Sequence, residues 1–210
     1  MSIGFFISGT DTNVGKTIVA SILIKKLGYF YWKPIQCGFS ENQETDTDIV
    51  QRLSGSKKIV KETIVLKNPL SPNIASRIEK KKICLSDFSK SFSLQKELII
   101  EGAGGLNVPI NDKDMVIDMI KFFSLPLILV CKTSLGTINH TLLSIEALKK
   151  KKIHLYGLIF IGNNIPETIK TISEFGSKIY GKTINIIAIL PIFNHVDNSS
   201  IMEMVKIVKI

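Results

Sequence analysis

The chain alternates short apolar runs with amphipathic stretches, and this alternation constrains its fold more than any other feature. Each run is apolar at successive positions, which is typical of a strand buried on both faces. After the first run, Ile18, Ile22 and Leu23 share one helical face, and Gly28 is placed to end that helix. We predict strands over 3–8, 29–34, 97–102, 126–132, 155–162 and 184–191. We predict helices over 15–28, 114–123, 138–151 and 166–180.

Strands that alternate with helices predict an α/β fold, with a mostly parallel central sheet and helices on both faces. Residues 55–95 are the least regular part of the pattern. No internal repeat or Pro/Ser-rich linker divides the chain, so we expect residues 1–210 to form a single domain. In sheets of this kind ligands bind at the carboxyl ends of the strands, and the candidate functional residues are sought there.

The composition of the chain argues against a nucleic-acid-binding or membrane protein. The 27 Lys and Arg residues outnumber the 18 Asp and Glu residues, but the lysines are spread in short groups with few aromatic residues between them, which disfavours a nucleic-acid surface. The three cysteines show no C-x-x-C pairing, as expected in a reducing compartment. No basic segment precedes the first apolar run, and no run approaches the ~20 residues of a membrane span. We therefore expect a cytoplasmic protein with no nucleic-acid or membrane partner.

The stretch GTDTNVGKT, Gly9 to Thr17, lies between the first predicted strand and helix, the context of a phosphate-binding P-loop. The common motif G-x-x-x-x-G-K-[ST] would place its first glycine at position 10, whereas here it is Gly9. Backbone N–H groups and Lys16 would bind phosphate oxygens, and the Thr17 hydroxyl would bind Mg²⁺. We predict a P-loop NTPase-type domain with a variant loop. Its predicted nucleotide-binding residues are Asn13, Val14, Gly15, Lys16, Thr17 and Ile18.

Acidic residues follow two of the predicted strands. Glu101 ends the strand over 97–102 and would hold Mg²⁺, directly or through water. Asp46 and Asp48 lie beyond the second strand, and either could complete the metal coordination. We favour Asp48 because the apolar pair Ile-Val follows it. The turn after Glu101, also predicted to contact the nucleotide, consists of Gly102, Ala103 and Gly104.

Lys33 ends the second predicted strand and would face the same cleft, where a second lysine could stabilise a highly charged phosphoryl species. Cys37 lies nearby, but no basic neighbour in the sequence would activate its thiol, so a nucleophilic role is disfavoured. The segment Leu135 to Asn139 leads into a helix whose free N–H groups could bind a carboxylate. His140 has no partner at metal-ligand spacing, and we interpret it as structural.

Four segments together resemble the dethiobiotin synthetases, the ATP-dependent carboxylases of biotin biosynthesis. They are GTDTNVGKT, KPIQCG, EGAGGLNVPI and LGTINHT, in that order, and the resemblance covers the chain nearly end to end. The loop with its shifted glycine is specific to that family, and EGAGGLNVP is the next most specific segment. The resemblance therefore accounts for the unusual spelling of the P-loop.

The resemblance implies a ligase that forms C–N bonds. An amine of 7,8-diaminononanoate would take up CO₂ as a carbamate, whose oxygen attacks the ATP γ-phosphate to give a carbamic–phosphoric anhydride. The second amine would then close the ureido ring and release phosphate. This chemistry needs positioning and charge neutralisation more than a protein nucleophile. ATP and CO₂ or bicarbonate would be co-substrates, and Mg²⁺ the cofactor.

Residue roles follow from the same resemblance. Lys16 and Lys33 would be catalytic and would stabilise the transferring phosphoryl group and the carbamate. Mg²⁺ would be held by Thr17, Asp48 and Glu101. The diamine site would include Thr12, Lys33 and Cys37. The family is a homodimer, so the substrate carboxylate would be bound across the subunit interface by the helix start, which here contains Leu135, Gly136, Thr137 and Asn139.

The chain departs from the family pattern at two positions. Relatives carry an adenine-reading asparagine where Ile161 stands, so the predicted base-side residues are Asn163, Asn164 and Pro191. Cys37 replaces a small hydroxylated residue, which alters the expected hydrogen bond to substrate.

Three other functions are alternatives to the ligase. A partitioning-type regulatory ATPase would have a lysine early in the loop, where this chain has Asp11. A glutamine-dependent amidase needs a further domain, for which 210 residues leave no room. A non-catalytic nucleotide sensor remains an alternative on the same fold.

Overall fold

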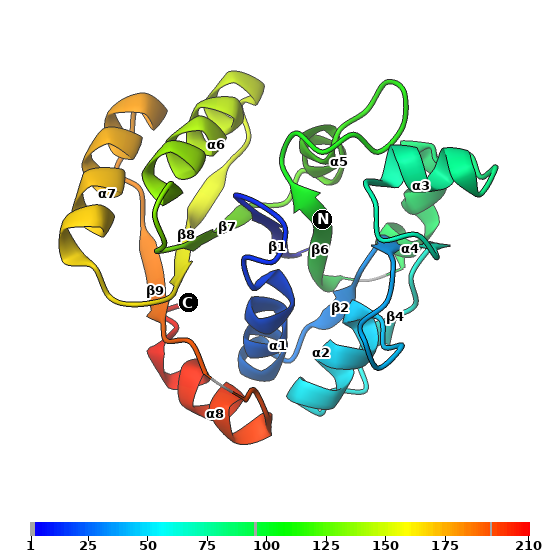
Figure 1. The fold of residues 1–210 in the computed structure, drawn as a ribbon, viewed down its shortest axis with the longest axis horizontal. Helices are drawn as coiled ribbons and strands as arrows, with labels where there is room; N and C mark the ends of the chain where they lie inside the picture. The colour runs from blue at the N-terminus through cyan, green and yellow to red at the C-terminus, as the bar shows by residue number, and fades with distance from the viewer. Residues whose placement is uncertain (1–2, 95, 194) are drawn as a thin grey trace.

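The computed structural model describes residues 3–94, 96–193 and 195–210. Within these residues, the centre is a seven-stranded parallel sheet in the order β4-β2-β6-β1-β7-β8-β9 (Figure 1). Its strands are β1 (Ile3–Gly9), β2 (Phe30–Trp32), β4 (Ile59–Val60), β6 (Glu97–Gly105), β7 (Leu127–Lys132), β8 (Leu155–Ile161) and β9 (Ile186–Leu190). Strands β3 (Ile35–Cys37) and β5 (Ile64–Leu66) pair separately, also in parallel. The predicted α/β class is confirmed.

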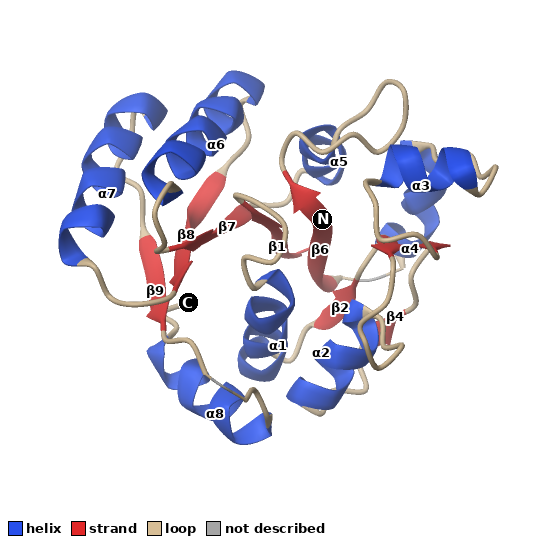
Figure 2. Ribbon diagram, viewed as in Figure 1, coloured by secondary structure: helices blue, strands red, loops and turns tan. Residues whose placement is uncertain are grey.

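Helices cover both faces of the sheet (Figure 2). One apolar cluster fills the space under α1, α2 and α8, which contribute Ile22, Leu53 and Ile201 to it. The other lies under the opposite helices and includes Val116 from α5 and Ile145 from α6. The helices are α1 (Lys16–Leu27), α2 (Asp46–Ser54), α3 (Pro72–Ile78), α4 (Ser89–Ser93), α5 (Val116–Phe123), α6 (Thr137–Lys151), α7 (Pro166–Tyr180) and α8 (Asn198–Ile207), with a 3₁₀ turn at Leu85–Phe88.

The element boundaries mostly follow the sequence pattern. Helix α1 ends as predicted, because Gly28 takes the left-handed conformation at φ 67° and its N–H bonds to the Ile24 carbonyl. The predicted strand over 29–34 contains β2. The main difference comes directly after it, because the chain continues beyond Pro34 as β3, which was not predicted and which pairs with β5 instead of joining the central sheet. Proline lacks the N–H that would continue a ladder of hydrogen bonds.

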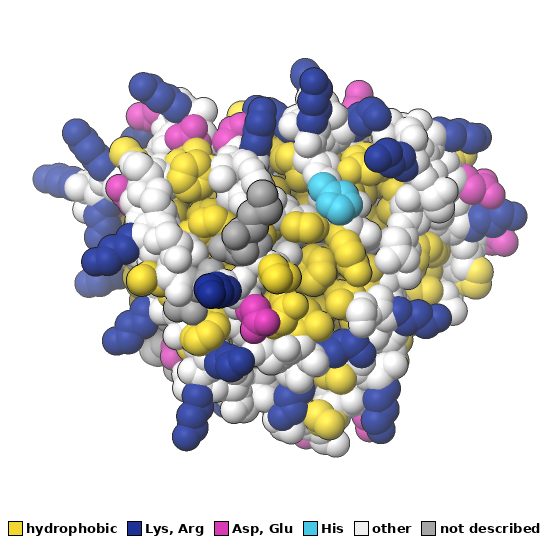
Figure 3. Space-filling view, turned by 180° about the vertical axis from the view of Figure 1, so that it is seen from behind, with side chains coloured by type: hydrophobic (Ala, Val, Ile, Leu, Met, Phe, Trp, Pro, Cys, Tyr) yellow, Lys and Arg dark blue, Asp and Glu magenta, His cyan; other side chains and the backbone are white. Residues whose placement is uncertain are grey.

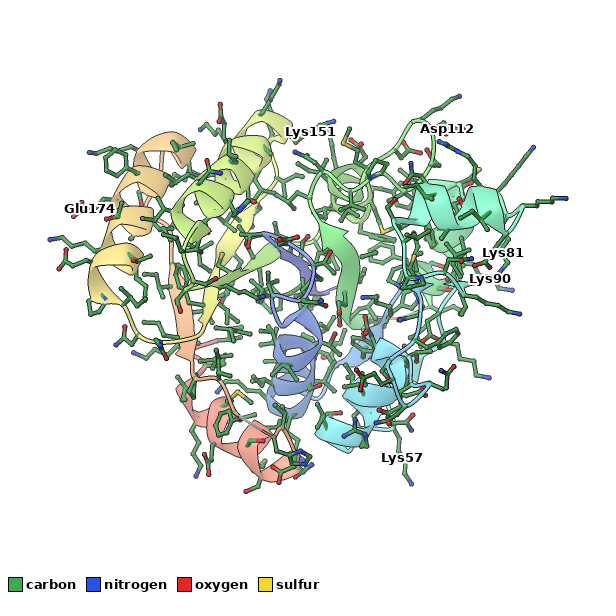
Figure 4. The ribbon with its side chains drawn as sticks, viewed as in Figure 1. Lys57, Lys81, Lys90, Asp112, Lys151 and Glu174 are labelled. Atoms are coloured by element: carbon green, nitrogen blue, oxygen red, sulfur yellow. The ribbon has the colours of Figure 1, made fainter. Side chains whose placement is uncertain are left out.

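Charged side chains are distributed over the outside of the molecule. Lys and Arg side chains surround the face seen in Figure 3 and do not gather in one patch. Figure 4 shows six charged side chains at the outer edge: Lys57, Lys81, Lys90, Asp112, Lys151 and Glu174. This distribution agrees with the reading of the lysines as solvated surface groups. In the three described ranges, none of the helices has the length and apolar character required to span a bilayer.

Candidate active site

The P-loop connects β1 to α1 at the carboxyl edge of the sheet (Figure 1). Gly9 must be a glycine because a Cβ there would lie 2.5 Å from Val14 Cγ2 and 2.8 Å from the Asp11 carbonyl oxygen. Gly15 has φ 97°, and a Cβ would lie 2.4 Å from Ile161 Cδ1. The shifted first glycine is therefore needed where β1 ends, because the loop folds back over it.

Lys16 lies over this loop and is almost fully buried. Its Nζ donates a hydrogen bond to the Asp11 carbonyl oxygen at 2.9 Å. Burial, with the nearby Lys33 ammonium as the second cause, lowers the pKa of Lys16 to about 8. A partly desolvated cation at a helix N-terminus is unfavourable without an anion, so this arrangement is suited to binding phosphate.

Glu101 connects three elements. Its Oε1 accepts hydrogen bonds from Thr17 Oγ1 and Lys33 Nζ, each at 3.0 Å. Its Oε2 accepts a hydrogen bond from the Tyr31 hydroxyl at 2.9 Å. The side chain is 1% exposed, and burial raises its pKa while the Lys33 ammonium opposes that rise. Strand pairing explains the contact with the P-loop, because Glu101 on β6 lies opposite Ile7 on β1, just before the loop.

Lys33 is the cation of this cluster. Its Nζ lies 2.5 Å from Asp46 Oδ2 and also donates to the Gly102 carbonyl oxygen at 3.2 Å. Burial alone would lower the pKa of Lys33, but the carboxylates of Glu101 and Asp46 outweigh it and raise that pKa. Lys33 therefore stays charged in a buried position beside the P-loop, where it can stabilise negative charge that develops on a substrate.

Comparison with known proteins identifies the family. A family model described as "AAA domain" matches residues 4–200. The ATP-dependent dethiobiotin synthetase BioD of Afipia carboxidovorans is 44% identical over 178 residues, which cover 84% of each chain. That of Lawsonia intracellularis is 45% identical over 172 residues, 82% of each chain. The chain belongs to the ATP-dependent dethiobiotin synthetase family.

More distant structures share the fold of this dethiobiotin synthetase family member. A ParA family ATPase from Chlorobium tepidum superposes with a TM-score of 0.55 at 13% identity, covering 97% of this chain and 90% of that one. The septum site-determining protein MinD from Pyrococcus horikoshii, complexed with Mg-ADP, gives 0.56 at 12% identity, covering 98% and 95%. At this identity the likeness shows the P-loop NTPase fold alone.

The two aspartates at the start of α2 have different partners in the structure. Asp48 Oδ2 accepts hydrogen bonds from the Thr45 N–H and hydroxyl, both at 2.9 Å, and the Thr45 hydroxyl accepts one from the Asp48 N–H. This reciprocal pair is a capping box that begins α2, and it occupies Asp48 at the surface. Asp46, the alternative, is the carboxylate that contacts Lys33. Because the cap engages the Asp48 side chain, the geometry favours Asp46 over the predicted Asp48 as the candidate metal ligand.

The turn Gly102 to Gly104, which we predict to contact the nucleotide, ends beside the P-loop. Gly9 pairs with Gly105, and a Cβ on Gly104 would lie 3.6 Å from Thr12 Oγ1. Cys37 is half-buried at the end of β3, and burial raises the pKa of its thiol to about 11. A protonated thiol agrees with a lining role and not with a nucleophilic one.

A cavity of about 460 Å³ lies on the other side of the loop, towards β8. Asn163 contributes to its lining, and Ile161 packs over Gly15 there. Asn164 and Pro191 are exposed and stand outside the lining recorded for the described residues. The cavity is lined by Asn13, Val14, Gly15, Lys132, Thr133, Ser134, Ile161, Gly162, Asn163, Ile165 and Ile192.

At the start of α6, which we predict to bind the substrate carboxylate, some side chains are exposed and one points inward. Gly136 begins α6 with φ 91°, and Leu135 before it is fully exposed. The Thr137 side chain points inward, because its hydroxyl donates to the Lys132 carbonyl oxygen at 2.5 Å. Its backbone N–H also has a partner, since it donates to the Ser134 carbonyl oxygen at 3.1 Å, while Asn139 is exposed. His140, interpreted as structural, borders a cavity of about 320 Å³ between α6 and the P-loop.

Two residues of the site were missed by sequence analysis. Tyr31 lies within an apolar run and carries no motif of its own, although it is the third hydrogen-bond donor to Glu101. Gln36 is buried, and its Oε1 accepts a hydrogen bond from the Asp46 N–H at 3.2 Å, which fixes the start of α2 beside Lys33. Period-two alternation with Lys33 was the available signal for Tyr31, because alternate residues of a strand share a face.

Proposed function

We propose that this chain makes dethiobiotin from 7,8-diaminononanoate, CO₂ and ATP, a C–N bond-forming ring closure in biotin biosynthesis. Support comes from the relatives named ATP-dependent dethiobiotin synthetase, which match 84% of the chain. The structural observation that carries the proposal is the buried Lys33–Glu101 ion pair, 3.0 Å long, beside a P-loop. It provides a fixed cation next to the expected γ-phosphate position.

The nucleotide would lie along the P-loop. Backbone N–H groups from Asn13 to Thr17 and the Lys16 ammonium would bind the phosphates. The base would enter the cavity of about 460 Å³ that Val14 and Ile161 border. Lys16 would exchange its present bond to the Asp11 carbonyl for phosphate oxygens.

The neighbouring side chains fit a Mg²⁺ ion. The Thr17 hydroxyl and the carboxylates of Glu101 and Asp46 are hard oxygen donors, and Mg²⁺ is usually held by one or two carboxylates together with substrate phosphates. Thr17 and Glu101 already lie 3.0 Å apart. When bound, Mg²⁺ would neutralise phosphate charge and orient the γ-phosphoryl group.

Lys33 would act at the reacting atoms. A carbamate formed from the substrate amine and CO₂ carries a negative charge that must approach the charged γ-phosphate, and a buried ammonium between them reduces that repulsion. The carbamate oxygen would displace ADP, and the second amine would then attack the carbonyl carbon and release phosphate. Thr12 and Cys37 would border the diamine.

The active unit would be a homodimer. Leu135, Ile138 and Leu143 are exposed apolar residues at the start of α6, close to the cavity that His140 borders. Burying them against a second copy would bring the start of α6, over Leu135 to Asn139, towards the partner's substrate carboxylate. Sedimentation equilibrium is expected to give a dimer, and a fully active monomer would contradict this part of the proposal.

A coupled phosphate-release assay tests the function. With ATP, Mg²⁺ and bicarbonate present, release is expected to depend on added 7,8-diaminononanoate, and mass spectrometry should detect dethiobiotin. A diamine that lacks the carboxylate is the matched control and should react poorly. Phosphate release that is indifferent to the diamine would reject the ligase and favour a regulatory ATPase of the partitioning class.

A further inference from the structure

Tyr31 and Lys33 share one face of the segment that contains β2. Successive strand residues point to opposite faces, so positions 31 and 33 point the same way. Tyr31 lies opposite Ile99 on the neighbouring strand β6, and Glu101 is two residues further along that strand on the same face. The Tyr31 hydroxyl spans this offset and lies 2.9 Å from Glu101 Oε2. The strand register therefore places the Tyr31 hydroxyl beside the Glu101 carboxylate.

The three donors bind the two oxygens of the Glu101 carboxylate. Thr17 and Lys33 both donate to Oε1, whereas the Tyr31 hydroxyl donates to Oε2 at 2.9 Å. Tyr31 is 0% exposed, and its ring packs in the apolar cluster under α1 and α2. Thr17 and Lys33 are groups that the proposed nucleotide and carbamate would engage. Tyr31 alone of the three is remote from those ligands and can hold the carboxylate throughout a reaction cycle.

We propose that Tyr31 is a positioning residue that holds Glu101 in the orientation needed for the Mg²⁺-bound nucleotide. The proposal rests on the proposed function, since it gives Glu101 its part in binding Mg²⁺. A buried carboxylate oxygen that loses its donor is left unpaired, and the group then turns towards its remaining partners. For Glu101 those partners are Thr17 and Lys33, so the carboxylate would turn away from the orientation that Tyr31 sets.

The test compares Y31F with the matched control Y156F. Phenylalanine keeps the ring of Tyr31 and removes only the hydroxyl. Tyr156 on β8 is half-buried with its ring edge-on to Phe5 at 4.7 Å, and no hydrogen bond from its hydroxyl to the described residues is recorded. ADP affinity is measured by calorimetry with and without Mg²⁺, and thermal melting is measured for both variants.

Y31F is expected to bind ADP like the wild type without Mg²⁺ and to lose most of the affinity gain that Mg²⁺ provides. Its kcat should fall about tenfold, the rate equivalent of one lost hydrogen bond to a charged group, with KM for the diamine unchanged. Y156F should match the wild type in each of these measurements. In a double-mutant cycle with E101Q, the effect of Y31F on the Mg²⁺-dependent gain should disappear, because Tyr31 acts through Glu101.

An equal Mg²⁺-dependent gain in Y31F and Y156F would overturn the proposal, and so would additive effects in the cycle with E101Q. A Y31F protein that does not fold would assign the hydroxyl to stability and overturn the positioning role as well. These measurements use only ADP and Mg²⁺ for their binding part. Failure of the proposed function, seen as diamine-independent phosphate release, is therefore distinguishable from failure of this inference.

Discussion

Lys33 Nζ lies 2.5 Å from Asp46 Oδ2, in an ion pair that joins the segment after β2 to the first turn of α2. The same ammonium contacts Glu101, so one buried cation compensates two carboxylates. Removing one partner of a buried pair is costly because the other charge stays buried without compensation. Lys33 therefore contributes both to the proposed chemistry and to the order of the site.

Replacing Lys33 by Met tests the chemical role, because Met keeps most of the buried stem and removes the charge. We expect kcat to fall by about 10²- to 10³-fold, the effect of removing one preorganised group that stabilises developing charge. ATP affinity should change little, since Lys16 and the loop N–H groups bind the phosphates. Lys57→Met is the control, because Lys57 lies at the outer edge of the molecule (Figure 4). Lost ATP binding with chemistry retained would show that the role assigned to Lys33 is wrong.

Replacing each of the two aspartates of α2 by asparagine should affect a different property, activity for Asp46 and stability for Asp48. Asp46→Asn removes the carboxylate that contacts Lys33, so activity should fall and more Mg²⁺ should be needed for half-maximal rate. Asp48→Asn weakens only the capping box with Thr45, which is worth about 1 kcal/mol, so it should lower Tm by a few degrees and leave kcat unchanged. Kinetics at varied Mg²⁺ and a melting curve separate the two. The reverse pattern would return the metal role to Asp48.

The same pair shows how far the sequence could predict the site. Glu101 and Lys33 were found because they end buried strands, and strand ends converge in a parallel sheet. Asp46 and Asp48 both lie in the first turn of α2, and their orientations differ because Asp48 completes the capping box with the N-cap Thr45. The sequence pattern also did not predict β3 after Pro34, because its pairing with β5 depends on contacts distant in sequence.

Nucleotide binding is expected to depend on pH through Lys16. Burial and Lys33 lower its pKa to about 8, so the free protein loses this charge as pH rises through that value. Bound phosphates would favour the charged form and raise the pKa. ADP affinity should therefore be level below about pH 8 and fall above it, with proton uptake on binding.

Calorimetry at about pH 8.5 in two buffers with different ionisation enthalpies measures this proton uptake. Lys16→Arg is the matched control, because a guanidinium keeps its proton and should abolish the buffer dependence. Equal binding enthalpies in both buffers for the unmodified protein would contradict the assignment to Lys16.

The three cysteines should differ strongly in reactivity. Burial raises the pKa of Cys37 to about 11 and that of Cys131 to about 12, whereas Cys84 is exposed. Because the thiolate is the reactive form, iodoacetamide should modify Cys84 first, and the other two only slowly or after unfolding. Peptide mass spectrometry over a time course gives the order. Rapid labelling of Cys37 in the folded protein would show an activated thiol and reopen a nucleophilic role.

Alanine substitutions of the two glycines at the ends of α1 can distinguish backbone strain from steric conflict, because both glycines have a left-handed backbone conformation. Gly15 has φ 97° and Gly28 has φ 67°, so alanine is strained at both. A Cβ at Gly28 would meet no atom of the described residues within 4 Å, and Gly28→Ala should cost only about 1 kcal/mol in the free energy of unfolding. A Cβ at Gly15 would lie 2.4 Å from Ile161 Cδ1, so Gly15→Ala should destabilise more and weaken ADP binding.

The double variant G15A/I161V tests whether the contact with Ile161 Cδ1 causes the larger destabilisation expected of G15A. Valine lacks the Cδ1 atom that a Cβ at position 15 would meet, so the substitution removes the clash and leaves the strained φ unchanged. Urea denaturation and ADP calorimetry should show G15A/I161V recovering most of the difference between G15A and G28A. If I161V brings no recovery, the requirement for glycine comes from the loop backbone alone, and Ile161 does not restrict the P-loop from the side of β8.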